Sequence, residues 1–151
     1  MPDPPALHSR KGSRAKRVPD RAAYRTLADF RYLIRRFLEF SEAAAQQAGL
    51  TARQHQALLA IKGFPGDSPS IGDLSDRLCI RHHSAVELVD RLVEAGLLER
   101  SHDPQDRRRV LLRLTQSAEQ RLALLASAHL DELHRLRPAL LEILGRVDHG
   151  R

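Results

Sequence analysis

Apolar residues recur at steps of three and four positions over a first long stretch of the chain, which is the spacing of an amphipathic helix. The pattern runs from residue 22 to residue 48 and ends at Gly49. Its apolar stripe includes Leu27, Phe30 and Phe37 and is wider than contact with a single neighbour requires. We therefore expect this helix to pack both on its own domain and on a second subunit.

A second leucine-rich stretch follows Thr115, whose hydroxyl is suited to cap a helix. Leucines cover most of the circumference of this stretch. Pro138 is expected to interrupt it, because proline lacks the N–H that a helix interior needs, and a last short helix is expected beyond. Together the two long stretches, residues 21–48 and 116–151, predict an intertwined dimer layer.

Two shorter helices are predicted between the long ones, and each begins with a capping box. In this pattern a hydroxyl residue and a residue three positions later satisfy each other's backbone groups. Thr51 with Gln54 opens a helix that is expected to stop before the loop of residues 64–69. Ser70 with Asp73 opens the next helix.

The stretch after Ser70 predicts two helices joined by a tight corner. Cys79 and Ile80 make the corner, and the second helix is expected from about Arg81 to Ala95, where Gly96 supplies a left-handed end. The face expected to be buried consists of Ala85, Leu88, Val89 and Leu92. The opposite face carries the polar residues His83, Ser84, Glu87 and Arg91.

A β-hairpin with three adjacent arginines near its tip is predicted after this helix. A short strand is expected over residues 97–101, and the turn formers of residues 103–106 follow it. The run from Arg107 to Leu114 then alternates in polarity as a strand does. The order of helix, corner, helix, strand, basic loop and strand predicts a mainly α fold, a winged helix-turn-helix with a two-stranded β-hairpin wing.

The net charge of +6 is concentrated at the start of the chain. Residues 1–21 hold six basic and two acidic residues, so the remainder has a net charge of only +2. Residues 1–20 contain four prolines and little to bury, which predicts a disordered basic tail. Such a tail is either a solubilising leader or an arm that follows DNA phosphates. The case for DNA binding therefore depends on the helix and the hairpin.

Several classes of protein are disfavoured by the sequence. The single cysteine excludes an internal disulfide and fits a reducing cytoplasm. No stretch approaches the roughly 18 apolar residues of a membrane span, and no apolar signal-peptide region follows the basic start. There is no glycine-rich phosphate loop, nucleophile elbow or carboxylate pair. We expect a soluble, cytoplasmic protein that is not an enzyme and needs no cofactor.

Four segments carry a recognisable spacing. They are Leu50-Thr51-x-x-Gln54, Leu74-Ser75-x-x-Leu78, Leu88-Val89-Asp90-Arg91-Leu92-x-x-Ala95-Gly96-Leu97-Leu98, and Asp103-Pro104-x-Asp106-Arg107-Arg108-x-x-x-x-x-Leu114-Thr115. These segments resemble the MarR family of bacterial transcriptional regulators over about residues 22–147. The resemblance implies a homodimer that binds a pseudo-palindromic operator through residues 49–115. Such proteins are usually repressors released by a small ligand or an oxidant.

The resemblance also implies roles for individual residues. Arg108 matches the wing arginine that enters the minor groove, and Asp106 matches the carboxylate that orients it. Arg107 and Arg109 would then contact phosphates. The expected DNA-binding set is completed by Ser70 and by the residues that would face base edges in the major groove, His82, His83, Ser84, Val86 and Glu87.

Two departures from the family pattern leave alternatives open. Glu87 stands where a basic or hydroxyl residue is common, and this acid motivates a winged-helix protein-interaction module without DNA binding. Cys79 stands where the turn usually has a glycine. Together with His82 and His83 it motivates a regulator switched by thiol oxidation or by a metal ion. A small buried residue at a tight corner is the simpler role for Cys79.

An effector pocket is expected beside the first long helix, where most of the six aromatic residues lie. Phe30, Phe37 and His55 are the candidate lining residues for a small-molecule effector. A packed aromatic core is the alternative interpretation of the same residues.

Overall fold

The computed structural model describes residues 18–66 and 68–149, which form five helices and one two-stranded antiparallel sheet. In chain order the elements are α1 (Arg21–Gln47), α2 (Ala52–Lys62), α3 (Ile71–Leu78), α4 (His82–Glu94), β1 (Leu98–His102), β2 (Val110–Leu114) and α5 (Gln116–His149). The predicted mainly α winged-helix fold is confirmed. The basic tail predicted over residues 1–20 lies, for residues 1–17, outside the described residues.

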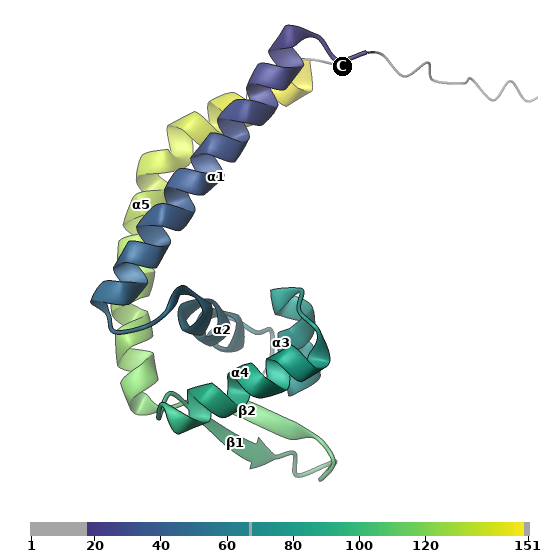
Figure 1. Cartoon of the computed structure of the whole chain (residues 1–151), viewed down its shortest axis with the longest axis vertical. Helices are drawn as coiled ribbons and strands as arrows, with labels where there is room; N and C mark the ends of the chain where they lie inside the picture. Colours follow the sequence, from purple (N-terminus) through teal and green to yellow (C-terminus); the bar gives the residue numbers. More distant parts are fainter. Residues whose placement is uncertain (1–17, 67, 150–151) are drawn as a thin grey trace, which may run out of the picture.

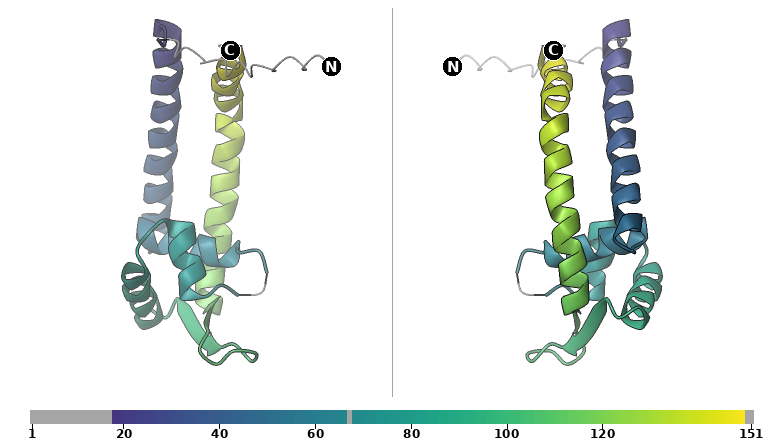
Figure 2. Two further views of the ribbon diagram at one scale, coloured as in Figure 1. Left: turned by 90° about the vertical axis from the view of Figure 1, so that its right-hand side faces the viewer. Right: turned by 90° about the vertical axis from the view of Figure 1, so that its left-hand side faces the viewer.

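The long helices α1 and α5 run side by side in opposite directions (Figures 1 and 2). They project as an arm from a lobe made of α2, α3, α4 and the hairpin (Figure 1). At the far end of the arm Arg146 of α5 donates to Asp29 of α1 at 2.7 Å and to Glu142 at 2.6 Å. The hairpin therefore lies at one extreme of the molecule, and the start of α1 and the end of α5 lie at the other.

Two of the helices, α2 and α3, begin at the capping boxes that the sequence predicts. The Gln54 N–H donates to Thr51 Oγ1 at 3.1 Å, and the Thr51 N–H donates to Gln54 Oε1 at 2.9 Å. Ser70 and Asp73 exchange the same pair of bonds at the start of α3. α1 has a cap that was not predicted, because Asp20, assigned to the tail from sequence, accepts a backbone N–H of the first turn at 2.8 Å.

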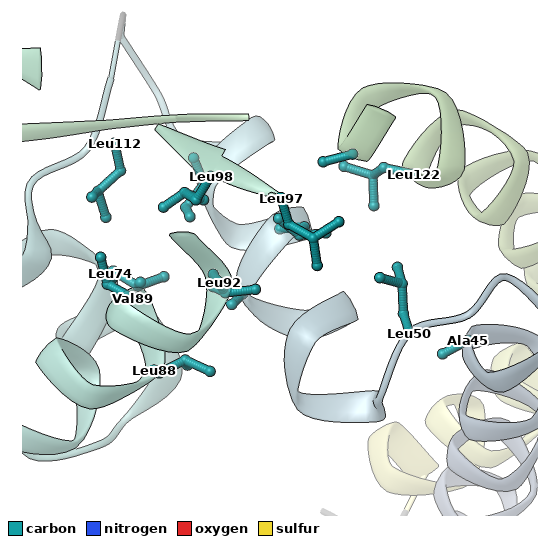
Figure 3. Close-up of a cluster of buried hydrophobic side chains, with 14 of the residues drawn as sticks. Ala45, Leu50, Leu74, Leu88, Val89, Leu92, Leu97, Leu98, Leu112 and Leu122 are labelled. Carbon is teal, nitrogen blue, oxygen red and sulfur yellow. The ribbon is translucent and has the colours of Figure 1, made fainter. Parts of the chain in front are cut away.

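One leucine-rich core joins the lobe to the foot of the arm (Figure 3). Leu74 of α3, Leu92 of α4 and Leu112 of β2 are at most 1% exposed. Leu50 and Leu122, which are 3% and 4% exposed, continue the same core toward α1 and α5 (Figure 3). Because the core is continuous, the lobe cannot change its angle to the arm without repacking these side chains.

Pro138 does not interrupt α5, so the prediction of a separate last helix is wrong. A proline inside a helix removes one hydrogen bond and crowds the preceding turn. Contacts beyond the proline nevertheless keep the helix in place, since Ile143 is buried and Arg146 bonds to Asp29 of α1. Packing along α1 therefore outweighs the local effect of one proline.

The corner between α3 and α4 turns at Cys79, whose φ of 53° lies in the left-handed region. The side chain is exposed, so the prediction of a small buried residue is wrong. In this conformation the Cβ of any residue other than glycine crowds the following carbonyl oxygen, at a cost of roughly 1–2 kcal/mol. This crowding is the physical reason why glycine is usual at this corner.

We expect Cys79→Gly to raise the free energy of unfolding by about 1 kcal/mol, because glycine relieves the crowding although it loses more backbone entropy on folding. Cys79→Ser is the matched control, since it removes the thiol and keeps the Cβ. Its free energy of unfolding should stay within about 0.5 kcal/mol of the parent value. Urea unfolding followed by circular dichroism measures both, and equal stabilities of the two variants would contradict strain at this corner.

Candidate nucleic-acid interface

α4 has one buried and one exposed face, as its sequence predicts. The buried face consists of Ala85, Leu88, Val89 and Leu92. On the other side His82, His83 and Glu87 are exposed, while Ser84 and Val86 are half-buried. The five side chains proposed to face bases therefore all keep some surface that a partner can contact.

The turn between β1 and β2 is built by two aspartates. Asp103 Oδ1 accepts from the Gln105 N–H at 2.9 Å, and Asp106 Oδ1 accepts from the Arg108 N–H at 3.1 Å. The Arg109 N–H donates to the Asp106 carbonyl at 2.9 Å, and the Arg109 carbonyl accepts from the Asp103 N–H at 3.0 Å. The three arginines lie near the tip of the hairpin, as predicted, but β2 begins only after Arg109, so they belong to the turn and not to the strand.

Arg108 projects from this turn, with 96% of its side chain exposed. Its Nε lies 3.6 Å from Asp106 Oδ1, the atom that also accepts the Arg108 N–H. An ion pair this exposed adds at most about 1 kcal/mol to stability. Its effect is therefore mainly to orient Arg108, because one carboxylate contacts both its backbone and its side chain.

Arg109 is engaged by the lobe. Its Nη2 donates to Asp73 Oδ2 at 3.0 Å, and the same oxygen accepts from the Ser70 N–H at 2.8 Å and the Ser70 hydroxyl at 2.7 Å. The bonds from Ser70, together with the guanidinium, hold the pKa of Asp73 below its usual value. Sequence reasoning identified Asp73 as a helix cap only, because no local pattern indicates a contact with a residue 36 positions away.

Five of the predicted DNA-binding residues line one open hollow of about 410 Å³. They are Ser70 at the start of α3, His82 at the start of α4, and Asp106, Arg108 and Arg109 of the wing turn. The other predicted residues, His83, Ser84, Val86, Glu87 and Arg107, lie outside its lining. The fold thus brings together five side chains from three separate segments. Two of these side chains are arginines.

Charge is distributed unevenly along α4. The start of the helix lies beside the wing, since His82 lines the same hollow as Arg108. Further along the helix Glu87, Asp90 and Glu94 are exposed acids, and Asp90 forms an ion pair with an arginine of β1. A polyanion is therefore favoured near the start of α4 and disfavoured toward its end.

The predicted effector residues are brought together only in part. Phe37 and His55 both contact His129 of α5, with ring centroids 5.9 Å and 4.7 Å from its ring. Phe30 lies seven residues before Phe37 on α1 and is 37% exposed. His129 was not among the predicted effector residues, although both Phe37 and His55 contact it.

His129 links α5 to α1 at the foot of the arm. The Leu125 carbonyl can only accept, so the His129 Nδ1–H donates to it at 2.7 Å. In the neutral ring Nε2 then accepts from the Ser41 hydroxyl of α1 at 2.8 Å. Phe40 also lies edge-on to the ring, with centroids 5.3 Å apart. A polar hydrogen-bonded ring thus lies within an aromatic cluster where the arm meets the lobe.

A regulator switched by a metal ion needs a cluster of suitable ligands. Within residues 18–66 and 68–149, no group of three or more histidine, cysteine, aspartate or glutamate side chains could hold a metal ion. A metal site at His82 and His83 would therefore need a ligand from elsewhere. In the same part of the chain, every helix is too short or too polar to cross a membrane.

A helix pair joined by a tight corner and followed by an arginine-tipped hairpin defines a winged helix-turn-helix protein. Residues 48–109, which include α2, α3, α4 and the wing turn, match the sequence profile of the MarR family. The resemblance seen in the sequence is confirmed over these residues, which match the MarR family.

Two curated proteins are similar to part of the chain. YcgE of Bacillus subtilis strain 168, an uncharacterized HTH-type transcriptional regulator, is 38% identical over 85 residues, which is 55% of this chain and 53% of YcgE. A putative transcriptional regulatory protein for the hcr operon of Thauera aromatica is 33% identical over 92 residues, 61% of this chain and 54% of that protein. The chain thus spans about half the length of the curated relatives it matches.

Solved structures share the fold at low sequence identity. AbsC, a MarR family transcriptional regulator from Streptomyces coelicolor, has a TM-score of 0.70 at 21% identity, over 89% of this chain and 92% of AbsC. A mutant of S. aureus MepR bound to an oligodeoxyribonucleotide has a TM-score of 0.62 at 20% identity, over 82% of this chain and 97% of that one. These two likenesses thus concern the fold, over most of the length of each chain.

We expect the stability of the protein to fall on mild acidification because of His55. Burial and the neighbouring His129 hold the pKa of His55 below its ordinary value of 6.5, so the unfolded chain binds a proton more readily than the folded chain. The contribution of neutral His55 is therefore complete above the unfolded pKa of about 6.5 and is lost as the pH falls through that value toward the folded pKa. Urea unfolding at pH values from about 5 to 8 measures the effect.

His55→Gln should flatten this pH dependence, since glutamine does not titrate. His134→Gln is the control, because His134 lies exposed on α5. The prediction is contradicted if the parent protein and His55→Gln lose stability equally as the pH is lowered.

Proposed function

We propose that the protein is a DNA-binding transcriptional regulator that binds a pseudo-palindromic operator as a homodimer and acts as a ligand-responsive repressor in the cytoplasm. The observation that carries the proposal is the hollow that Ser70, His82 and the wing turn share, with Arg108 projecting beside it. The family of the lobe, and the solved MepR complex with an oligodeoxyribonucleotide, support the same class of partner.

In this proposal the start of α4 enters the major groove, which is wide enough for a helix. Ser84 donates to a phosphate or a base, Val86 contacts a thymine methyl, and Glu87 accepts from cytosine N4. Arg108 enters the adjacent minor groove, whose negative potential is strongest where the groove is narrow. Asp90 and Glu94, further along α4 than Glu87, then disfavour a deeper or shifted docking of the helix, because they would approach phosphates.

The arm supports a homodimer. Leu27, Ile34 and Leu38 share one face of α1 and are 60%, 40% and 49% exposed. Leu133 and Leu144 share one face of α5 and are 46% and 47% exposed. Apolar stripes of this length on both arm helices are suited to bury each other against a second copy. The dimer would then present two lobes to half-sites about one helical turn, roughly 34 Å, apart.

The proposed response to a ligand depends on the angle between lobe and arm. The cluster of Phe37, His55 and His129 lies where α1, α2 and α5 meet. A small molecule that bound there and favoured one angle would shift the population of dimers toward or away from the spacing that fits the operator. A ligand with equal affinity for both angles would have no effect.

Arg108→Ala should weaken binding to a duplex selected from a random-sequence library by about five-fold or more, since an arginine that contacts base edges contributes roughly 1–3 kcal/mol. Arg135→Ala is the control, because Arg135 is a 74% exposed arginine of the arm. Fluorescence anisotropy at fixed salt measures the affinity, and sedimentation velocity checks that the oligomeric state is unchanged. If the parent protein binds without sequence preference and without salt dependence, it is not a regulator of this kind.

Leu133→Glu combined with Leu144→Glu should convert the dimer to a monomer, because the change places two carboxylates in the proposed apolar interface. Leu124→Glu is the matched control: Leu124 is 74% exposed and, nine positions before Leu133, lies on the opposite face of α5. Sedimentation velocity distinguishes the two species. A parent protein that is monomeric, or a double variant that stays dimeric, would contradict this interface.

A further inference from the structure

We propose that the ion pair of Asp73 and Arg109 is a brace that sets the position of the wing, and that Arg109 is a positioning residue and not a phosphate contact. The inference deepens the proposed DNA-binding function and rests on it. It replaces the phosphate role that the family resemblance implied for Arg109.

The lobe side of the brace is fixed by the cap of α3. Asp73 Oδ2 accepts from the Ser70 N–H and the Ser70 hydroxyl in addition to Arg109 Nη2. The side chain of Asp73 is 32% exposed, which makes it less accessible than the 46% exposed Arg109. Because two bonds from Ser70 hold the carboxylate at the first turn of the helix, it offers the wing an acceptor whose position does not depend on the wing.

The wing side of the brace is fixed through the backbone of the same arginine. The Arg109 N–H donates to the Asp106 carbonyl, and the Arg109 carbonyl accepts from the Asp103 N–H. With the side chain bonded to Asp73, Arg109 connects both aspartates of the turn to the lobe. Holding Arg109 in place therefore holds the turn that carries Arg108.

Neighbouring contacts join the same two parts of the molecule. The Leu112 N–H of β2 donates to the Pro69 carbonyl at 2.9 Å, and Leu111 forms a β-bridge with Ser70. The Asp73–Arg109 pair extends this line of contacts two residues further toward the tip. The start of α3 thus supports the wing from β2 up to the turn.

The charges of the turn are divided accordingly. Arg109 is paired at 3.0 Å and would have to leave Asp73 to contact a phosphate. The side chain of Arg108 is 96% exposed, and its Nε lies 3.6 Å from Asp106 Oδ1. It is therefore free to reach outward. A wing that is already in position loses less conformational entropy on binding, which favours affinity without any new contact to DNA.

Hydrogen exchange of the DNA-free protein tests the brace directly. Asp73→Asn and Arg109→Gln should each speed amide exchange in the wing turn at least several-fold while leaving exchange in α5 unchanged. Asparagine is chosen because its amide oxygen can still accept from the Ser70 N–H, although it carries no charge to pair with Arg109. Arg107→Gln is the matched control, since it removes a neighbouring charge of the same turn without touching Asp73. Exchange in the turn that is unchanged by both brace variants would overturn the proposal.

A double-mutant cycle of DNA affinity separates the two roles of Arg109. If Arg109 is a brace, Asp73→Asn and Arg109→Gln each weaken DNA binding. The double variant then has the same DNA affinity as whichever single variant binds more weakly. If Arg109 contacts a phosphate, Asp73→Asn strengthens binding by releasing it, and Arg109→Gln lowers the slope of log affinity against log salt by about 0.9. The second result would overturn the brace.

The outcome also distinguishes this inference from the proposed function. A parent protein that binds no DNA would contradict the regulator proposal and with it the part of the inference that concerns DNA. The exchange measurement would still decide whether Asp73 and Arg109 hold the wing. Arg107→Gln combined with Asp73→Asn should be additive in affinity, because the two changes share no contact, and strong coupling between them would count against a specific brace.

Discussion

Leucine packing between the lobe and the foot of the arm is the constraint on which the rest of the structure depends. Leu92 of α4 and Leu97 after it lie between the lobe side of the core and Leu122 of α5 (Figure 3). Close-packed interiors change by discrete repacking and not by gradual sliding. The direction in which α4 and the wing face is therefore set by buried side chains far from the surface that meets a partner.

The surface ion pairs of this protein hold side chains and segments in position more than they stabilise the fold. The pairs of Arg108 with Asp106 and of Arg146 with Asp29 are partly or largely exposed, and solvent screens such pairs, so they add little to stability. Truncating one buried leucine to alanine typically costs about 2–5 kcal/mol. Stability thus comes from the apolar core, while the charged contacts determine where the wing turn and the end of the arm are held.

Features with a local physical cause could be predicted from the sequence. Both capping boxes, the left-handed Gly96 with φ of 68° and the amphipathic α4 follow from residues a few positions apart. Whether the helix continues through Pro138 could not be predicted, because it depends on contacts of α5 with another helix. Likewise the exposure of Cys79 depends on how the corner sits on the lobe. In these cases tertiary packing decides between local options of similar energy.

In the candidate site, too, features with a local cause could be predicted and contacts between distant segments could not. The positions of the wing turn and the start of α4 were predicted, because the turn formers and the corner lie next to them in sequence. The link of Asp73 to Arg109, and the place of His129 between Phe37 and His55, join segments far apart in the chain. A single sequence carries no signal for such pairs, since any of several acids or histidines has the right chemistry.

The length of α5 has a mechanical consequence. A helix of 34 residues is about 50 Å long at 1.5 Å per residue, and it is attached to the lobe at one end only. A tilt of about 5° at the foot corresponds to a displacement of roughly 4 Å at the far end, by the geometry of a helix of that length. A small change of angle at the foot of the arm would therefore be amplified along the arm into a displacement comparable to the rise of one base pair.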